Sequence, residues 1–598
     1  MSENKFNFSV ESIIAEIGID EKYKRKTSDK EYIDDEFETP DVEIREEYSF
    51  VNTSVDDYDN YANISKKLKK QSNLFENKAK IVLFLLILSV YLTISAISNV
   101  PMIDYLNLIN YPYIYMLANV ALHIFAIIVS VDVISDGFSS VLSPNTNTLV
   151  SFSSFFILLH TLSVIFLKNP LAFLPYTAVS IFTLYCSLKS MKYDSRAKSF
   201  VYRICSMSSR LAFVCRDESK RRKFSLKKPT MNKQNFAKNV ETREKNLFFT
   251  IYFYFYLIFM VTFSIYVSNG SLAMFVWSAA SISAIAVPIN YIFSWSLPYK
   301  YAAKKLFDDG IAIKSYEDIK KMPQNDSIII SDRDLFPENS VSIEQMELYA
   351  RFTENEVFSY VACGFSKLNS CARPTFEYEL KKRYLRPLKC QKMDLIDENG
   401  FTFTANNKKI SIGNAKFVTN LGLTVFEGYD VTNPIYVVIS SQIASIISIK
   451  HNASPKMYHA ISTLEQNSIK LIISTLDFTI SSNLIARVYD LPNKSVIFDD
   501  FLTRYNQIQD EKDLNESILL ARQSGRTYIR AFIAARKLAW SVKLNMFLGT
   551  VCSLFGFSVV GYLLYNFSPT VLLPQNILLF LFFWSLPSVI ISFFYNNI

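Results

Sequence analysis

Long apolar runs recur along the chain, separated by polar stretches and short connections. The hydrocarbon core of a bilayer is about 30 Å thick, so a helix needs about 20 apolar residues to cross it. Eight runs approach that length. The pattern predicts a multi-pass α-helical membrane protein with eight spans, at residues 80–98, 113–134, 150–167, 171–188, 247–267, 273–297, 544–565 and 575–595, grouped into membrane segments 80–188, 247–297 and 544–598.

Basic residues are concentrated at one end of these spans. Lysines precede the first span, and residues 189–246 carry a dense basic set. The connections 99–112, 268–272 and 566–574 contain no Lys or Arg. Because Lys and Arg favour the cytoplasmic side, we expect a cell-membrane protein with both termini cytoplasmic. Lysines near anionic lipid explain the basic cluster, so the expected partner is the lipid bilayer and not a nucleic acid.

Two polar segments flank the first four spans. Residues 1–79 contain a long acidic stretch around residues 34–36 and 56–57, which predicts a largely disordered cytoplasmic N-terminal segment. Residues 189–246 form a basic cytoplasmic segment between the fourth and fifth spans. Neither segment shows the hydrophobic pattern of an independent folded domain.

One large polar region, residues 298–543 (the insert), lies between the sixth and seventh spans. Short apolar runs at 327–331, 471–473 and 495–498 each end in hydroxyl or carboxylate side chains, as parallel strands do at the crevice of an α/β domain. Residues 346–448 instead alternate polar and apolar positions, which predicts an antiparallel sheet. We therefore expect an α/β domain, formed by residues 298–345 and 449–543, that carries an inserted β-rich module.

Composition agrees with the membrane assignment. The 598 residues are 50% hydrophobic and 15% aromatic, with only 13 glycines and a net charge of +8. The seven cysteines show no paired spacing. The sequence therefore predicts neither a disulfide framework nor a Cys-x-x-Cys metal site, and it assigns no metal ligand.

Three phrases, in chain order, carry a family resemblance. Pro288 in the sixth span is followed by Gly-Ile-Ala-Ile-Lys at residues 310–314. Ile-Gly-Asn stands at residues 412–414, and Arg-Thr-Tyr-Ile-Arg at residues 526–530 leads into the seventh span. Their order and their spacing relative to the spans resemble the heavy-metal-transporting (Cys-Pro-Cys type) P-type ATPases. The resemblance implies a haloacid-dehalogenase-like α/β domain with a nucleotide-domain-like insert at residues 346–448.

The resemblance also implies site residues. Asp332 stands at the phosphorylated aspartate of the family, and Asp334 stands where the family has a neutral threonine, so its charge would repel a phosphoryl group. If the protein is active at all, Mg²⁺ and ATP are the implied cofactors. The implied catalytic residues are Asp332, Asp334, Thr475, Asp499 and Asp500; Gly413 and Asn414 are implied for nucleotide binding, and Pro288, Asn545 and Ser585 for the ion path.

Several family motifs are missing. Both cysteines around Pro288 are absent, residues 189–246 are too few for an actuator domain and lack its TGE phrase, and the GDGxND loop has no clear counterpart. Phosphoryl transfer depends on positioning and charge neutralisation, so these losses favour a degenerate member of the family. We interpret the chain as a pseudo-ATPase with a scaffold, sensor or regulatory role and a protein partner in the membrane.

Two alternatives stay open. The first is an atypical ATP-driven cation (metal) transporter that uses Asp332 as phosphoryl acceptor. The second is a membrane-tethered phosphatase of the haloacid-dehalogenase-like class, in which Asp334 is an acid/base instead of an obstacle. Whether the chain hydrolyses ATP therefore stays open at the level of sequence.

Overall fold

The computed structural model describes residues 56–595, except 99–100, 102, 166–172, 208–210, 219–222, 231–235, 237–246, 350, 397, 426–432, 493 and 505–515. Residues 1–55, part of the segment predicted as disordered, lie outside the described residues. Residues 56–79 of that segment are helical, so the prediction was wrong there. They begin α2 (Asp56–Ser95), whose Tyr61 and Phe75 are buried, and this packing stabilises a helix that composition alone does not favour.

Six helices in the described part of the chain are long and apolar enough to cross a membrane, or seven if one bent pair is a single span. The six are α2, α3 (Pro112–Val129), α5 (Thr146–Ile165), α8 (Leu247–Ser268), α20 (Gly525–Tyr565) and α21 (Pro574–Tyr595). In the bent pair, α9 (Leu272–Ile285) is followed, after a 41° bend at Pro288, by α10 (Ile289–Phe293) and α11 (Ser296–Asp308).

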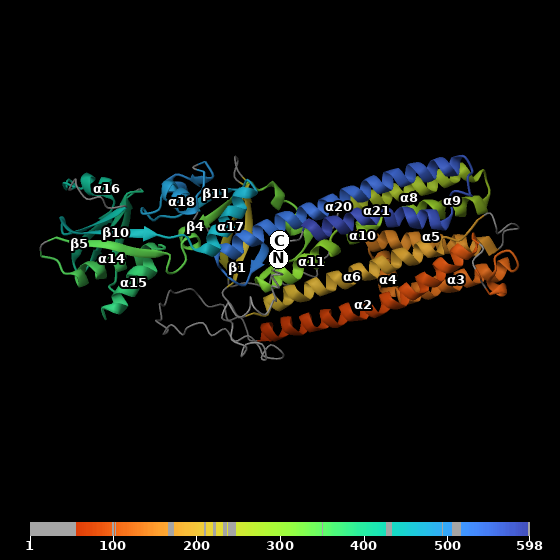
Figure 1. The fold of residues 1–598 in the computed structure, drawn as a ribbon, viewed down its shortest axis with the longest axis horizontal. Helices are drawn as coiled ribbons and strands as arrows, with labels where there is room; N and C mark the ends of the chain where they lie inside the picture. Colours follow the sequence, from red (N-terminus) through yellow and green to blue (C-terminus); the bar gives the residue numbers. More distant parts are fainter. Residues whose placement is uncertain are drawn as a thin grey trace, which may run out of the picture. The chain divides into compact units, whose positions relative to one another are not determined.

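The predicted span at 171–188 is not among these candidate spans, because its helix is apolar over only part of its length. Its helix, α6 (Thr177–Cys205), begins only at Thr177, and Lys189 and Lys192 follow after three turns. Both lysines pair with Glu76 of α2, at 2.9 and 2.6 Å. The helices α2 and α6 lie side by side (Figure 1). The count of eight spans is therefore not confirmed by the described residues.

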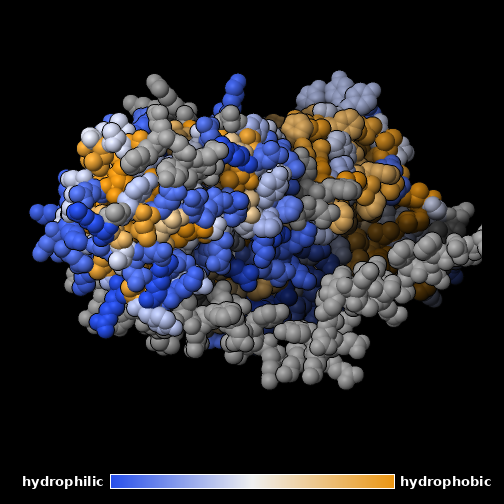
Figure 2. All heavy atoms as spheres, turned by 60° about the vertical axis from the view of Figure 1, so that its left-hand side comes forward, coloured by the Kyte–Doolittle hydropathy of each residue, from blue (hydrophilic) through white to orange (hydrophobic). Residues whose placement is uncertain are grey.

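Apolar side chains on the outer faces of the candidate spans are exposed, including Phe84 of α2, Leu117 of α3 and Ile258 of α8. Figure 2 shows hydrophobic residues gathered over the helical part, whereas hydrophilic residues are frequent over the insert. Exposed apolar area of this extent marks a surface that meets lipid or another protein. The pattern fits a protein with several membrane-embedded helices.

A seven-stranded sheet lies next to the helices, in the order β12-β11-β4-β2-β1-β13-β3. The three predicted apolar runs form β4, β11 and β12, which are neighbouring and parallel. Their apolar residues are largely buried, as expected for such strands. The bounds are β1 (Leu211–Glu218), β2 (Lys223–Thr230), β3 (Ile311–Ile313), β4 (Ser327–Ser331), β11 (Lys470–Ser474), β12 (Val496–Phe498) and β13 (Glu516–Leu520).

The hairpin β1–β2 comes from the basic segment 189–246, for which the sequence predicted no strand. β2 pairs in parallel with β4, and β1 pairs antiparallel with β13. The buried Ser225 accepts a hydrogen bond from the Tyr528 hydroxyl at its carbonyl (2.7 Å) and one from the Asn325 amide at its hydroxyl (2.7 Å). The segment between α6 and α8 is thus built into the middle of the sheet.

The β-rich module is an antiparallel sheet, as predicted, in the order β5-β10-β9-β8-β7-β6. Helices α14 (Glu354–Leu368) and α15 (Arg373–Lys382) pack along it (Figure 1). The strands are β5 (Val341–Leu348), β6 (Gln391–Ile396), β7 (Gly400–Ala405), β8 (Lys408–Gly413), β9 (Pro434–Ile439) and β10 (Gln442–His451). The remaining helices are α4 (Val131–Ser139), α12 (Tyr316–Ile319), α13 (Asp332–Leu335), α16 (Ala415–Asn420), α17 (Pro455–Gln466) and α18 (Ser482–Tyr489).

Cys363 of α14 and Cys390, just before β6, form a disulfide. The sequence prediction of no disulfide framework was wrong for this pair. The two residues are 27 apart, a separation that matches no local cysteine motif. They meet because α14 folds back along the sheet, and that is a tertiary contact which spacing alone does not predict.

Replacing Gly364 with alanine should destabilise this module. A Cβ at Gly364 would lie 2.6 Å from a ring carbon of Phe401 in β7, closer than carbon atoms can pack. Overpacking of this kind costs about 1–3 kcal/mol. Thermal unfolding of the full chain in detergent should show the loss, while Lys367→Ala on the exposed side of α14 should change stability by less than about 0.5 kcal/mol. Equal melting of the two variants would contradict the packing.

Candidate functional site

Asp332 follows directly after β4 and is the first residue of α13. The hydroxyl of Ser331 caps this short helix by accepting from the Asp334 N–H at 3.3 Å. Asp332 is only 6% exposed, and its Oδ2 accepts a hydrogen bond from the Cys371 N–H at 2.8 Å. Cys371 lies in the turn between α14 and α15, so the β-rich module covers the carboxyl group.

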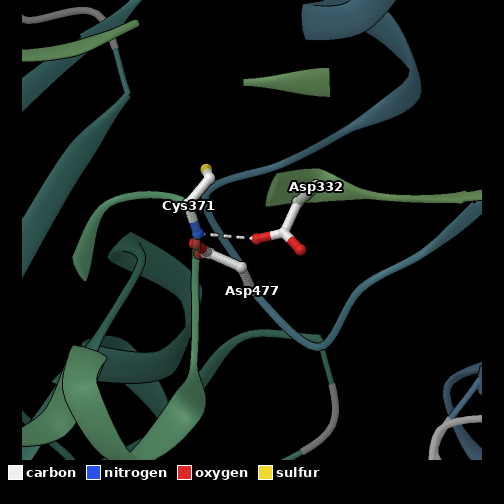
Figure 3. A group of neighbouring side chains, drawn as sticks. All are labelled: Asp332, Cys371 and Asp477. Carbon is white, nitrogen blue, oxygen red and sulfur yellow. Dashed lines mark hydrogen bonds between the residues drawn. The ribbon is translucent and has the colours of Figure 1, made fainter. Parts of the chain in front are cut away.

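A second carboxylate, Asp477, lies beside the first. It follows β11, the strand next to β4, and is 2% exposed. Its Oδ1 accepts from the Thr479 N–H (2.8 Å) and hydroxyl (2.7 Å), and its Oδ2 accepts from the Ser370 hydroxyl. Ligand atoms of Asp332, Cys371 and Asp477 all lie within 4.8 Å of one another (Figure 3). We call these three residues the Asp-Cys-Asp cluster.

Burial dominates the electrostatics of this cluster. Burial and, to a lesser extent, the charge of Asp477 raise the pKa of Asp332 to about 7, although the Cys371 N–H and Arg333 offset part of the shift. Burial also raises the pKa of the Cys371 thiol. Among the described residues, no lysine or arginine forms an ion pair with Asp332 or Asp477. The protonated form of Asp332 is therefore favoured relative to that of an exposed aspartate.

Asp334 does not join the cluster. Its carboxylate forms an ion pair with Lys227 of β2 and accepts from the Ser331 hydroxyl at 2.9 Å. Lys227 also donates to the carbonyl of Gln523 at 2.7 Å, and the Asp334 backbone packs against Gly525 at the start of α20. The structure thus turns Asp334 towards the hairpin and α20, where its charge is compensated.

Of the other predicted catalytic residues, Thr475 lies beside the Asp-Cys-Asp cluster, whereas Asp499 and Asp500 lie at the end of β12. Thr475 is buried beside the cluster, and its hydroxyl accepts from the Asp477 N–H at 3.1 Å. Asp499 and Asp500 follow β12, and their carbonyl groups accept from the side chain and the backbone of Arg504. The sequence analysis assigned neither Asp477, which lies two residues after Thr475, nor Cys371, for which the sequence carries no signal.

A cleft of about 550 Å³ lies between the β-rich module and the α/β domain. Asn414 and Lys416 line one side, and Asp477 and Ser481 line the other. The buried Arg504 joins the two sides, because it pairs with Glu398 and donates to the Thr475 carbonyl (2.8 Å). The cleft is the natural place for a ligand of the insert.

The two predicted nucleotide-binding residues have different roles here. Asn414 lines the cleft and also caps α16 by accepting from the Phe417 N–H at 3.0 Å. The space beside Gly413 is filled, since a Cβ there would lie 2.3 Å from the Phe417 ring and 2.6 Å from the Asn399 carbonyl. Packing alone therefore explains Gly413.

The predicted ion-path residues lie in the helical part. Pro288 caps α10 at the break after α9. Asn545 is buried and donates to Ser592 of α21 at 3.2 Å, whereas the hydroxyl of Ser585 bonds within its own helix. Asn290, which the sequence did not single out, donates to Ser588 at 2.7 Å. The side-chain oxygens of Asn290 and Asn545 are buried without a partner among the described residues.

Comparison with known proteins gives neither a family nor a curated relative, because no family model and no curated protein matches the chain. Among solved structures, it resembles a zinc-transporting PIB-type ATPase in the E2.Pi state, at 12% identity and a TM-score of 0.41, over 85% of this chain and 99% of that chain. It also resembles the catalytic domain of the CPx-ATPase CopB-B, at 14% identity and a TM-score of 0.24, over 35% of this chain and 73% of that chain. These likenesses alone assign neither a family nor an activity.

Proposed function

We propose that this chain is a membrane protein built on the plan of the heavy-metal P-type ATPases, which acts as a regulator or sensor and does not pump ions. Its termini and its insert are placed on the cytoplasmic side, as the distribution of lysine and arginine favours. The observation that carries the proposal is the hairpin β1–β2 in the middle of the seven-stranded sheet.

In the family that the sequence resembles, the segment between the fourth and fifth spans is an actuator domain that brings a dephosphorylating loop to the aspartate. In this chain the same segment supplies β1 and β2, which pair with β13 and β4. Withdrawing the hairpin would break backbone hydrogen bonds on both sides and expose Phe213 and Val214, which are buried. The segment is held in the sheet and is not free to act as a moving arm.

The surroundings of Asp332 also oppose phosphoryl transfer. A carboxylate nucleophile must be ionised, and cations must neutralise the charge of the transferred phosphoryl group. Here the carboxyl group is covered by Cys371, and a second carboxylate, Asp477, lies beside it. Lys227 is committed to Asp334 and to the Gln523 carbonyl. A γ-phosphate therefore meets neither an open nucleophile nor a lysine at this position.

The test is direct. Purified full-length protein, incubated with Mg²⁺ and γ-labelled ATP and quenched in acid, should carry no more hydroxylamine-sensitive label than the Asp332→Asn variant. Thermal unfolding of both samples controls for folding. Label that appears in the wild type and disappears in Asp332→Asn would overturn the proposal in favour of an atypical cation transporter, with Mg²⁺ and ATP as its cofactors. Asp332-dependent hydrolysis of a small phosphomonoester would favour the phosphatase.

A further inference from the structure

We propose that the Asp-Cys-Asp cluster binds a divalent transition-metal ion of the zinc class and thereby ties the β-rich module to the α/β domain. The three ligands come from the end of β4, from the turn between α14 and α15, and from the segment after β11. If the chain is the proposed sensor, this ion is the ligand that it senses, and this one role of the ion rests on the proposed function. The binding of the ion does not rest on it and is measured independently of the phosphorylation assay.

The geometry brings the ligand atoms together before any ion is bound. One oxygen of each aspartate and the Cys371 sulfur lie within 4.8 Å of one another, and all three residues are buried. Hydrogen bonds fix the two carboxylates in place, through the Cys371 N–H on Asp332 and through Thr479 and Ser370 on Asp477. Ligands held in this way need little rearrangement to receive an ion.

The charge of the cluster is uncompensated. Two buried carboxyl groups lie close together, and no lysine or arginine in the described part of the chain pairs with either of them. A divalent ion at the centre would supply the positive charge that the cluster lacks.

A second observation comes from His451, the last residue of β10. Its side chain is 5% exposed, and neither ring nitrogen has a hydrogen-bond partner among the described residues. The ring packs edge-on against Phe336, just after α13, and the charge of Asp477 acts on it. A buried imidazole without a partner is uncommon in folded proteins. His451 is not among the groups whose ligand atoms lie within 4.8 Å of one another, so we assign it as a neighbour of the site and not as a ligand of the ion.

The donor set selects the class of ion. Zinc takes thiolate, imidazole and carboxylate ligands in four-coordinate sites. Magnesium instead requires six oxygen ligands and keeps several waters, which a buried site with a thiol does not provide. A cobalt ion fits the same donor set as zinc and reports on the sulfur through its absorption spectrum.

The experiment uses full-length protein in detergent, reduced, chelator-treated and then dialysed against Zn²⁺ alone. We expect about one tightly bound ion per chain, and at least about tenfold weaker binding in Cys371→Ala. Cys215→Ala, which changes another buried cysteine outside the disulfide, is the matched control and should bind as the wild type does. With Co²⁺, a sulfur-to-metal absorption band should appear in the wild type and in Cys215→Ala but not in Cys371→Ala.

The variant Asp477→Asn serves as a control for misfolding, because it keeps the size of the side chain. It should weaken zinc binding, while its melting temperature in chelator should stay within a few degrees of that of the wild type. Absence of zinc binding in the folded wild type, or an unchanged cobalt band in Cys371→Ala, would overturn the metal site. The phosphorylation assay separates this failure from that of the proposed function. A chain that forms no phosphoenzyme and binds no zinc keeps the proposed function and loses only its ligand.

Discussion

Replacing Asp332 with asparagine should stabilise the metal-free protein at pH 8. The folded pKa of this carboxyl is about 7, against about 3.9 for an aspartate in an unfolded chain. The folded state therefore binds the proton more tightly than the unfolded state does. The protonated carboxyl of Asp332 therefore stabilises the folded state. This stabilisation is fully present below about pH 4 and is lost as the pH rises to about 7. The difference of about 3 in pKa corresponds to at most about 4 kcal/mol.

Thermal unfolding in chelator at pH 5 and pH 8 measures this effect. Asparagine keeps an oxygen that accepts from the Cys371 N–H but carries no charge beside Asp477. The variant should melt well above the wild type at pH 8, and the gap should narrow at pH 5. Asp500→Asn, at an exposed position outside the cluster, should show no such pH dependence. A variant less stable than the wild type at both pH values would mean that the ionised form of Asp332 is stabilised.

Replacing Lys227 with alanine should be strongly destabilising. Its side chain is 16% exposed and that of Asp334 is 9% exposed, so the ion pair between them lies largely out of water. Removing the lysine leaves the Asp334 carboxylate buried without its cation, which costs about 3 kcal/mol. It also leaves the carbonyl of Gln523 without its donor. The loss should appear as a lower melting temperature of the full chain.

A double-mutant cycle gives the control. The combined change Lys227→Ala and Asp334→Ala removes both charges, so it should be less destabilising than the two single changes added together. Lys223→Ala, at an exposed position on the same strand, should cost less than about 1 kcal/mol. Strict additivity of the two single changes would show that Lys227 and Asp334 do not stabilise each other.

The fold could be predicted from sequence where a strand is buried on both faces or alternates regularly. The runs at β4, β9 and β11 are apolar enough to stand out, and the alternation in β8 indicates the antiparallel module. The hairpin β1–β2 could not be predicted in this way. The lysines of β2 resemble a juxtamembrane cluster, and its partner strand β4 begins at residue 327, about 100 residues away in the chain.

The candidate site was only partly predictable because the sequence does not give the order of the strands in the sheet. Carboxylates follow both β4 and β12, and the sequence cannot tell which strands are neighbours. In the structure β12 is separated from β4 by β11, which places the carboxylates after it about 10 Å from Asp332. Asp477 follows β11, the strand between them, and therefore lies next to Asp332. Cys371 is 39 residues further along the chain than Asp332, and the fold of the β-rich module brings it to the site.

The position of β1 has a consequence for biosynthesis. One edge of this strand pairs with β13, which ends at Leu520, about 300 residues after β1. At a translation rate of about 5–20 residues per second, that edge waits roughly 15–60 seconds for its partner. An unpaired strand edge invites association with other chains. A chain truncated before residue 516 therefore keeps this edge of β1 unpaired and should aggregate more readily than the full chain.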